Sequence, residues 1–237
     1  MIPGLLPQTG LATVTLTGLD RHVDVAKVAA LSKRYPLLEW GVLLGARPEE
    51  LRYPSWEELE AWATFRQTHG VRMALHLCGK FAKQWLAKDP EVVKLASQFS
   101  RIQLNIIGKG LNHEDVRQAL IDNAHPAVIT QENRNNHELN QKLKGLPNHM
   151  VLFDSSGGRG IAAAQWPQSL EGLWCGYAGG LGPENIEQEL NHIHPIAGQS
   201  YWIDMEGKLR QTNDALDLDR CEQVLQKVEA WVQNQSV

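Results

Sequence analysis

The chain has 237 residues, of which 43% are hydrophobic and 21% are charged, and its formal net charge is −4. These values are ordinary for a globular protein, and they exclude the basic field that binding to DNA or RNA requires. The length suits one α/β barrel, which typically needs about 250 residues, so we expect a single domain over residues 1–237.

The cysteines and the first residues of the chain bear on the cellular compartment in which the protein is expected. Cys78, Cys175 and Cys221 form no CxxC pair and have no zinc-finger spacing, so we expect neither a disulfide framework nor a metal site. Residues 1–7 contain no basic region and no long apolar run, so we expect neither a signal peptide nor a membrane anchor. These features favour the reducing cytoplasm. We expect a small-molecule substrate, no cofactor and no membrane partner, and the oligomeric state stays open.

Short apolar runs alternate with amphipathic stretches along the chain, which is typical of β/α repeats around a parallel sheet. The apolar runs predict strands at Thr13–Thr17, Leu37–Leu44, Arg72–Leu77, Arg101–Ile106, Ala127–Thr130, Met150–Asp154, Gly172–Ala178 and Gln199–Asp204. The stretches between them predict helices at Val23–Lys33, Trp56–His69, Phe81–Ala87, His113–Ile121, Glu184–His192 and Asp219–Asn234. Helical patterning is weakest after the fifth and sixth strands. Eight units of about 30 residues predict a closed (β/α)8 TIM barrel.

Helix starts agree with this map. Ser55 precedes Trp56, and Glu58 follows Ser55 by three residues, which predicts a capping box. Pro183 and Glu184 suit the first turn of a later helix.

Polar residues gather at the predicted ends of the strands, where the functional residues of such barrels lie. They are Thr17, Arg52, His76, Cys78, Gln103, Asn105, Gln131, Asp154, Gly179, Gly180, Asp204, Glu206 and Gly207. An inward carboxylate needs a partner or water, so Asp154 and Asp204 predict a wet, polar pocket. The alternative is that each aspartate only caps a loop.

Two predicted strands run directly into glycines, at residues 153–160 and 176–185. Gly179 and Gly180 would let the backbone approach a ligand, and the helix that follows would point its N-terminal amides at the same place. A phosphate group fits such a position. The alternative is a glycine-rich turn that holds no ligand.

Several of these segments carry a family resemblance: Thr15–Asp20, Glu39–Leu44 with Arg52–Ser55, Gln103-Leu104, Phe153-Asp154 with Gly157–Gly160, and Ala178–Asn185. Together they resemble phosphoribosylanthranilate isomerase, a (β/α)8-barrel enzyme of tryptophan biosynthesis. The resemblance implies an Amadori rearrangement of a phosphorylated sugar derivative, in which an aspartate opens the ribose ring and a cysteine removes a proton from the sugar carbon. It implies that Asp154 is the acid, that Arg52 positions a substrate carboxylate and that Gly179 and Gly180 hold phosphate.

The chain differs from this family in the third strand and its loop (Leu75–Lys80), at Asn105 of the fourth strand, and at two positions that bear directly on the chemistry. Thr17 stands where the family has its cysteine, and a threonine hydroxyl is too weakly acidic to act unaided as a base near neutral pH. Glu206 stands where the family has small hydroxyl residues that help to hold phosphate. Its carboxylate would repel a phosphate unless it turns away, or unless Lys208 or Arg210 compensates.

The base could come from another strand. His76 and Cys78 share one face of the third strand because side chains alternate, and both have suitable chemistry. A structural role is the alternative for each. Lys80 also suggests a Schiff-base aldolase, although a lysine at a helix start is commonly only solvated.

The sequence therefore leaves three functions open. The first is an isomerase-like barrel whose catalytic residues are Asp154, Thr17 and His76, with substrate-binding residues Arg52, Gln103, Asn105, Gly179, Gly180, Asp204 and Gly207. The second is a diverged barrel that acts on another substrate class or binds a small ligand without catalysis. The third, a structural interaction module, fits poorly with polar, glycine-rich strand ends.

Overall fold

The computed structural model describes residues 10–47, 49–154 and 165–235, which form a closed barrel of eight parallel strands in the order β1 to β8. The strands are β1 (Gly10–Thr17), β2 (Leu38–Leu44), β3 (Met73–Cys78), β4 (Arg101–Asn105), β5 (Val128–Glu132), β6 (His149–Asp154), β7 (Trp174–Ala178) and β8 (Ser200–Met205). Pairing of β8 with β1 closes the barrel. The predicted TIM-barrel fold is confirmed.

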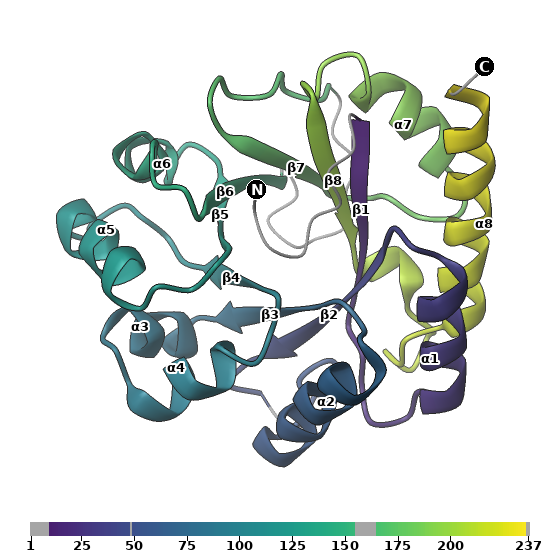
Figure 1. The fold of residues 1–237 in the computed structure, drawn as a ribbon, viewed down its shortest axis with the longest axis horizontal. Coiled ribbons are helices and arrows are strands. Elements are labelled where there is room, and N and C mark those ends of the chain that lie inside the picture. The colour runs from purple at the N-terminus through teal and green to yellow at the C-terminus, as the bar shows by residue number, and fades with distance from the viewer. Residues whose placement is uncertain (1–9, 48, 155–164, 236–237) are drawn as a thin grey trace.

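Helices surround the strands (Figure 1). They are α1 (Val25–Arg34), α2 (Trp56–His69), α3 (Lys80–Leu86), α4 (Pro90–Ala96), α5 (His113–Asp122), α6 (His137–Leu143), α7 (Ile186–Ile193) and α8 (Leu218–Gln235), with a short 3-10 helix η1 (Gly207–Leu209). The six predicted helices are present, with ends displaced by up to two residues. Between β6 and β7, the described residues 165–173 contain no helix.

Two helices were not among those predicted, α4 and α6. Helix α4 begins at its cap Asp89, whose side chain accepts hydrogen bonds from the backbone of Glu91 and Val92, and Pro90 occupies the first turn. An aspartate followed by proline is a known helix start, so the sequence did contain this signal. Helix α6 follows β5, where the helical pattern was weak.

The predicted capping box at α2 is confirmed. The Ser55 hydroxyl accepts a hydrogen bond from the backbone N–H of Glu58 at 3.3 Å, and the Glu58 carboxylate accepts one from the backbone N–H of Ser55 at 2.7 Å. Two backbone donors that the helix leaves unsatisfied thereby gain partners. The cap lies three residues after Arg52, at the end of the loop that carries it.

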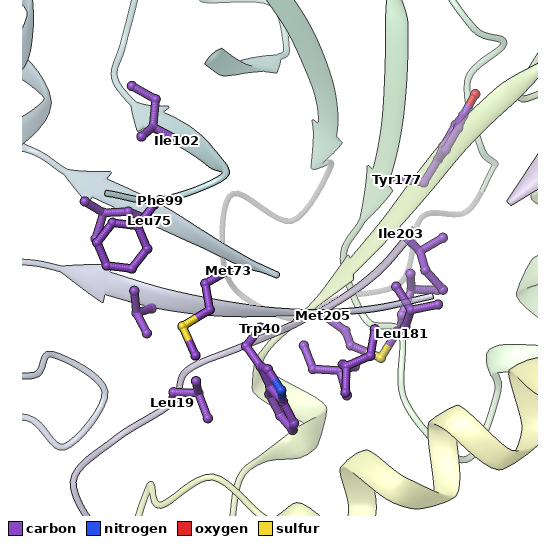
Figure 2. Packing of buried hydrophobic residues seen from close by; sticks show 14 of the residues in the cluster. Leu19, Trp40, Met73, Leu75, Phe99, Ile102, Tyr177, Leu181, Ile203 and Met205 are labelled. Atoms are coloured by element: carbon purple, nitrogen blue, oxygen red, sulfur yellow. The ribbon is translucent and has the colours of Figure 1, made fainter. Parts of the chain in front are cut away.

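Side chains alternate along each strand between an outer face and the inside of the barrel. The outward side chains form the main hydrophobic core against the helices, and Trp40, Leu75 and Ile203 within it are fully buried (Figure 2). Burying one such side chain contributes roughly 1.5–3 kcal/mol. This core holds the strands that position the inward residues.

The inside of the barrel is apolar on one side. A second hydrophobic cluster comes from β5 to β8 and contains Trp202, Ile129, Met150 and Leu152. The indole of Trp202 occupies space that a larger residue than Gly176 would take, since a Cβ atom at Gly176 would lie 2.1 Å from the ring. The barrel is therefore filled on this side, without a channel through its axis.

The inside is polar on the side of β1, β2 and β4. The Nε of Arg101 donates to both carboxylate oxygens of Glu39 at 3.1 Å, and its Nη2 donates to the hydroxyl of Thr15 at 3.0 Å. Both charged side chains have no exposed surface. The Arg101 guanidinium also lies 4.9 Å from the centre of the Trp202 ring. This ion pair joins the polar and apolar halves one layer beneath the strand ends.

No helix in the described part of the chain is both long enough and apolar enough to cross a membrane.

Candidate active site

A cavity of about 90 Å³ lies at the carboxyl ends of the strands. Eleven of the residues predicted at the barrel mouth line it: Thr17, His76, Gln103, Asn105, Gln131, Asp154, Gly179, Gly180, Asp204, Glu206 and Gly207. The lining also includes Leu43, Leu152, Ala178, Leu181, Met205 and Lys208. The structure therefore brings polar side chains from six strands and their loops (β1, β3, β4, β5, β6 and β8) together around one space.

Asp204 lies at the centre of this arrangement, and 6% of its surface is exposed. The hydroxyl of Thr17 donates a hydrogen bond to its Oδ1 at 2.8 Å. The Nε2 of His76 lies 3.7 Å from its Oδ2. Thr17 fits here because β2 has a glycine beside it: a Cβ atom at Gly41 would lie 2.3 Å from the Thr17 hydroxyl.

Burial controls the protonation of these groups. Burial raises the pKa of Asp204 to about 7, although the hydrogen bond from Thr17 and the charge of Arg101 act in the opposite direction. Burial also lowers the pKa of His76 to about 4. Near neutral pH, Asp204 can therefore gain and lose a proton, while His76 is a neutral imidazole.

Asp154 supplies a second carboxylate from β6. The Nε2 of Gln131 donates to its Oδ2 at 3.4 Å, and 9% of the Asp154 surface is exposed. Ala178 on β7 pairs with Asp154 on one side and with Asp204 on the other. Two strand spacings place the Cα atoms of the aspartates about 10 Å apart. The cavity therefore has a carboxylate on each side of a small alanine.

Amide and imidazole groups form another wall. The Nε2 of Gln103 donates to the Oδ1 of Asn105 at 2.7 Å, and the Nδ2 of Asn105 donates to the Cys78 sulfur at 3.2 Å. The Oε1 of Gln103 and the Nε2 of His76 are buried and have no hydrogen-bond partner within the described residues. Buried polar atoms of this kind need partners. A ligand with hydroxyl groups could supply them.

The loops after β7 and β8 form one end of the cavity. Gly179 and Gly180 have φ angles of 109° and 66°, a region that favours glycine. Asn185 holds the turn before α7, since its Nδ2 donates to the Gly180 carbonyl and its Oδ1 accepts from the Gly182 N–H, both at 3.0 Å. Gly207 begins η1 on the β8 side, directly after Glu206.

Arg52 lies in the loop before α2 and is not among the residues that line the cavity. Its Nη1 donates to the Oε1 of Glu206 at 3.0 Å, and its Nε donates to the Oδ2 of Asp214 at 3.0 Å. Burial raises the pKa of Glu206, while the charges of Arg210 and Arg52 act to lower it. The predicted binding of a substrate carboxylate by Arg52 would therefore require a change of partners.

Other predicted positions have different outcomes. Cys78 does not line the cavity, and burial raises the pKa of its thiol, which makes it a poor base at neutral pH. The glycines of the sixth-strand loop, Gly157–Gly160, lie outside the described residues. No group of three potential metal ligands occurs in the described ranges. The hydrogen bonds between Arg52 and Asp214 could not be predicted, because 162 residues separate the two in the chain.

Solved structures with a similar fold were identified. TrpF from Jonesia denitrificans matches with a TM-score of 0.61 and 16% identity, over 93% of this chain and 98% of that chain. A D-allulose 3-epimerase from Methylomonas sp. matches with a TM-score of 0.55 and 12% identity, over 94% and 98%. A mutant tryptophan synthase α-subunit from Pyrococcus furiosus matches with a TM-score of 0.55 and 9% identity, over 98% of both chains.

No family model and no curated protein matches the sequence. At 9–16% identity, the similarities to these solved structures show a shared TIM-barrel fold and no more.

Proposed function

We propose that the protein isomerises a sugar derivative by acid/base catalysis, with Asp204 as the base and Asp154 as the acid. The observation that carries this proposal is the buried Asp204 carboxyl, whose pKa of about 7 lies close to the pH at which a general base works best. Its position in the cavity between Thr17 and His76 gives it access to a bound molecule.

The proposed reaction follows the resemblance to phosphoribosylanthranilate isomerase but moves the base to a neighbouring strand. Asp154 protonates the ring oxygen of the sugar and opens the ring. Asp204 then removes the proton from the carbon beside the resulting carbonyl or imine, and the enol or enamine so formed takes up a proton at the former carbonyl or imine carbon to give the ketone. Thr17, at the position of the family's cysteine, orients the Asp204 carboxylate through its hydrogen bond.

The buried amide and imidazole groups suit a sugar as the ligand. A substrate hydroxyl could donate to the Oε1 of Gln103, and another could contact the Nε2 of His76, both of which need partners. His76 is neutral near pH 7 because its pKa is about 4, so it contributes a hydrogen bond and no positive charge. The fold is shared with TrpF and with an epimerase that acts on D-allulose, which agrees with sugar chemistry.

The test is turnover in D2O, measured by NMR, with phosphoribosylanthranilate and with a panel of aldoses and glycosylamines. We expect isomerisation with deuterium at the carbon beside the carbonyl. Asp204→Asn should slow it at least 100-fold, since proton transfer by a positioned group typically contributes 10²–10⁴-fold. The control Asp219→Asn alters an aspartate on α8 whose side chain is 81% exposed, and it should keep the wild-type rate.

Two results would contradict the proposal. If Asp204→Asn isomerises the substrate at the wild-type rate, Asp204 is not the base. If the wild-type protein shows no turnover at high enzyme concentration and Thr17→Cys creates it with phosphoribosylanthranilate, the present chain is not that isomerase.

A sugar-binding protein without catalysis is the second candidate. The observation that favours it is Thr17 itself, because the family's cysteine is replaced by a group that cannot act as a base. Saturable binding of a sugar by calorimetry, without deuterium exchange at any pH between 5 and 9, would identify this function.

A further inference from the structure

Glu206 is a carboxylate at the mouth of the barrel, directly before Gly207 in the chain. It lines the same cavity as Gly179, Gly180 and Gly207. Its Oε1 accepts a hydrogen bond from the Nη1 of Arg52 at 3.0 Å and lies 3.6 Å from the Nη2 of Arg210. The carboxylate is thereby held at this end of the cavity.

The two arginines beside Glu206 are also engaged by Asp214. The Nε of Arg52 donates to the Oδ2 of Asp214 at 3.0 Å, and its Nη2 donates to the Oδ1 of the same residue. The Nη1 of Arg210 donates to the Asp214 carbonyl at 2.7 Å. We call Arg52, Glu206, Arg210 and Asp214 the rim quartet. Its two positive and two negative charges balance.

The backbone around the rim quartet leaves space for it. A Cβ atom at Gly18 would lie 1.9 Å from the Nη2 of Arg210, and the Gly18 φ angle of 114° favours glycine. The Arg210 side chain is 4% exposed. Arg210 is therefore fixed against β1, and it cannot turn freely towards a ligand in the cavity.

A phosphate at the glycine loops would meet Glu206 without a free arginine to offset it. Repulsion between a dianion and a carboxylate about 4 Å away weakens binding at least ~10-fold, even at the dielectric constant of water. Lys208 lines the cavity too, but it is exposed, and its charge acts on Glu184. Water and salt screen such an exposed charge.

We infer that the end of the substrate beside Gly179, Gly180 and Gly207 is an uncharged, hydroxyl-bearing group, which donates a hydrogen bond to Glu206. This inference rests on the proposed function, and it makes the substrate a sugar derivative without phosphate. Glu206 takes the place of the anion, and the rim quartet keeps it there. Arg52 then acts as a positioning residue for Glu206.

The first experiment measures binding of inorganic phosphate by calorimetry to the wild-type protein, Glu206→Ser and Glu206→Gln. Wild-type protein should show no saturation, and the variants should bind phosphate at least 10-fold more tightly. The glutamine variant keeps the size of the side chain if the serine variant fails to fold. Glu187→Ser removes the same charge from an exposed position on α7 and should behave like wild-type protein.

Two outcomes of this titration overturn the inference. Saturation of the wild-type protein as strong as that of Glu206→Ser would show that the carboxylate does not exclude phosphate. Absence of binding in all proteins would show that Glu206 does not occupy a phosphate position.

The second experiment compares deuterium exchange for matched sugars with and without a terminal phosphate. We expect kcat/KM at least 10-fold higher for the unphosphorylated member of each pair. Exchange confined to the phosphorylated members would overturn this inference and retain the proposed isomerase. Exchange with neither member of any pair would instead contradict the proposed function, and the phosphate titration would still decide the inference.

Discussion

Replacement of Asp204 by asparagine is expected to stabilise the protein at pH 8 and to have little effect near pH 4. Asparagine has the same shape, and its Oδ1 can still accept the hydrogen bond that Thr17 donates at 2.8 Å. It cannot ionise. The substitution therefore removes the cost of a buried charge without removing the contact.

The magnitude follows from the pKa. Burial raises the pKa of Asp204 from the ordinary value of 3.8 to about 7. Between these values the folded state binds more protons than the unfolded state, so stability falls as the pH rises through this window. Above pH 7 the full cost applies, which is about 4 kcal/mol at roughly 1.4 kcal/mol per pH unit. Below pH 4 both states are protonated, and the cost disappears.

The assay is urea unfolding of wild-type protein and Asp204→Asn at pH 4, 6 and 8. The difference in free energy of unfolding should grow steadily across this series, to about 4 kcal/mol at pH 8. Asp219→Asn, on the exposed surface of α8, should show no such trend. An Asp204→Asn protein that is destabilised at pH 8, or stabilised equally at all three values, would refute the reasoning.

Three further outcomes are expected. His76→Gln should make the protein less sensitive to acid. Burial lowers the pKa of His76 from 6.5 to about 4, so the folded state binds fewer protons than the unfolded state and loses stability as the pH falls through this window. An unchanged midpoint of acid unfolding would contradict this. Arg101→Met should cost about 3–5 kcal/mol by leaving the Glu39 charge buried alone, and Glu39→Gln in the same chain should recover part of it in a urea double-mutant cycle. Thr17→Val should raise the pKa of Asp204, so the pH profile of deuterium exchange should move to higher pH; a shift to lower pH would show that the hydroxyl does not stabilise the carboxylate.

The barrel could be predicted because each of its strands leaves a local signal in the sequence. Apolar runs of the right length recur eight times, and the capping residues Ser55 and Glu58 are only three positions apart in the chain. Helix α4 was not predicted, although Asp89 and Pro90 are typical of a helix start. The second short helix, α6, has too weak an apolar pattern for such a prediction.

The composition of the mouth could be predicted as well, because parallel strands of a barrel bring their carboxyl ends to one side. The partners of these residues could not be predicted from the sequence. Glu39 with Arg101, and Arg52 with Asp214, come from distant parts of the chain, and no local pattern connects them. The protonation of Asp204 likewise depends on burial by the whole barrel.

The hydrogen bond from Thr17 to Asp204 spans 187 positions of the chain, from the first strand to the last. Closing so long a loop is slow relative to local contacts, so we expect this bond to form late in folding. An emerging chain that has completed only its first strands cannot yet contain the proposed base in its working environment. Enzymatic activity would then appear only after the barrel has closed. A refolding chain should therefore regain its helices before it regains turnover.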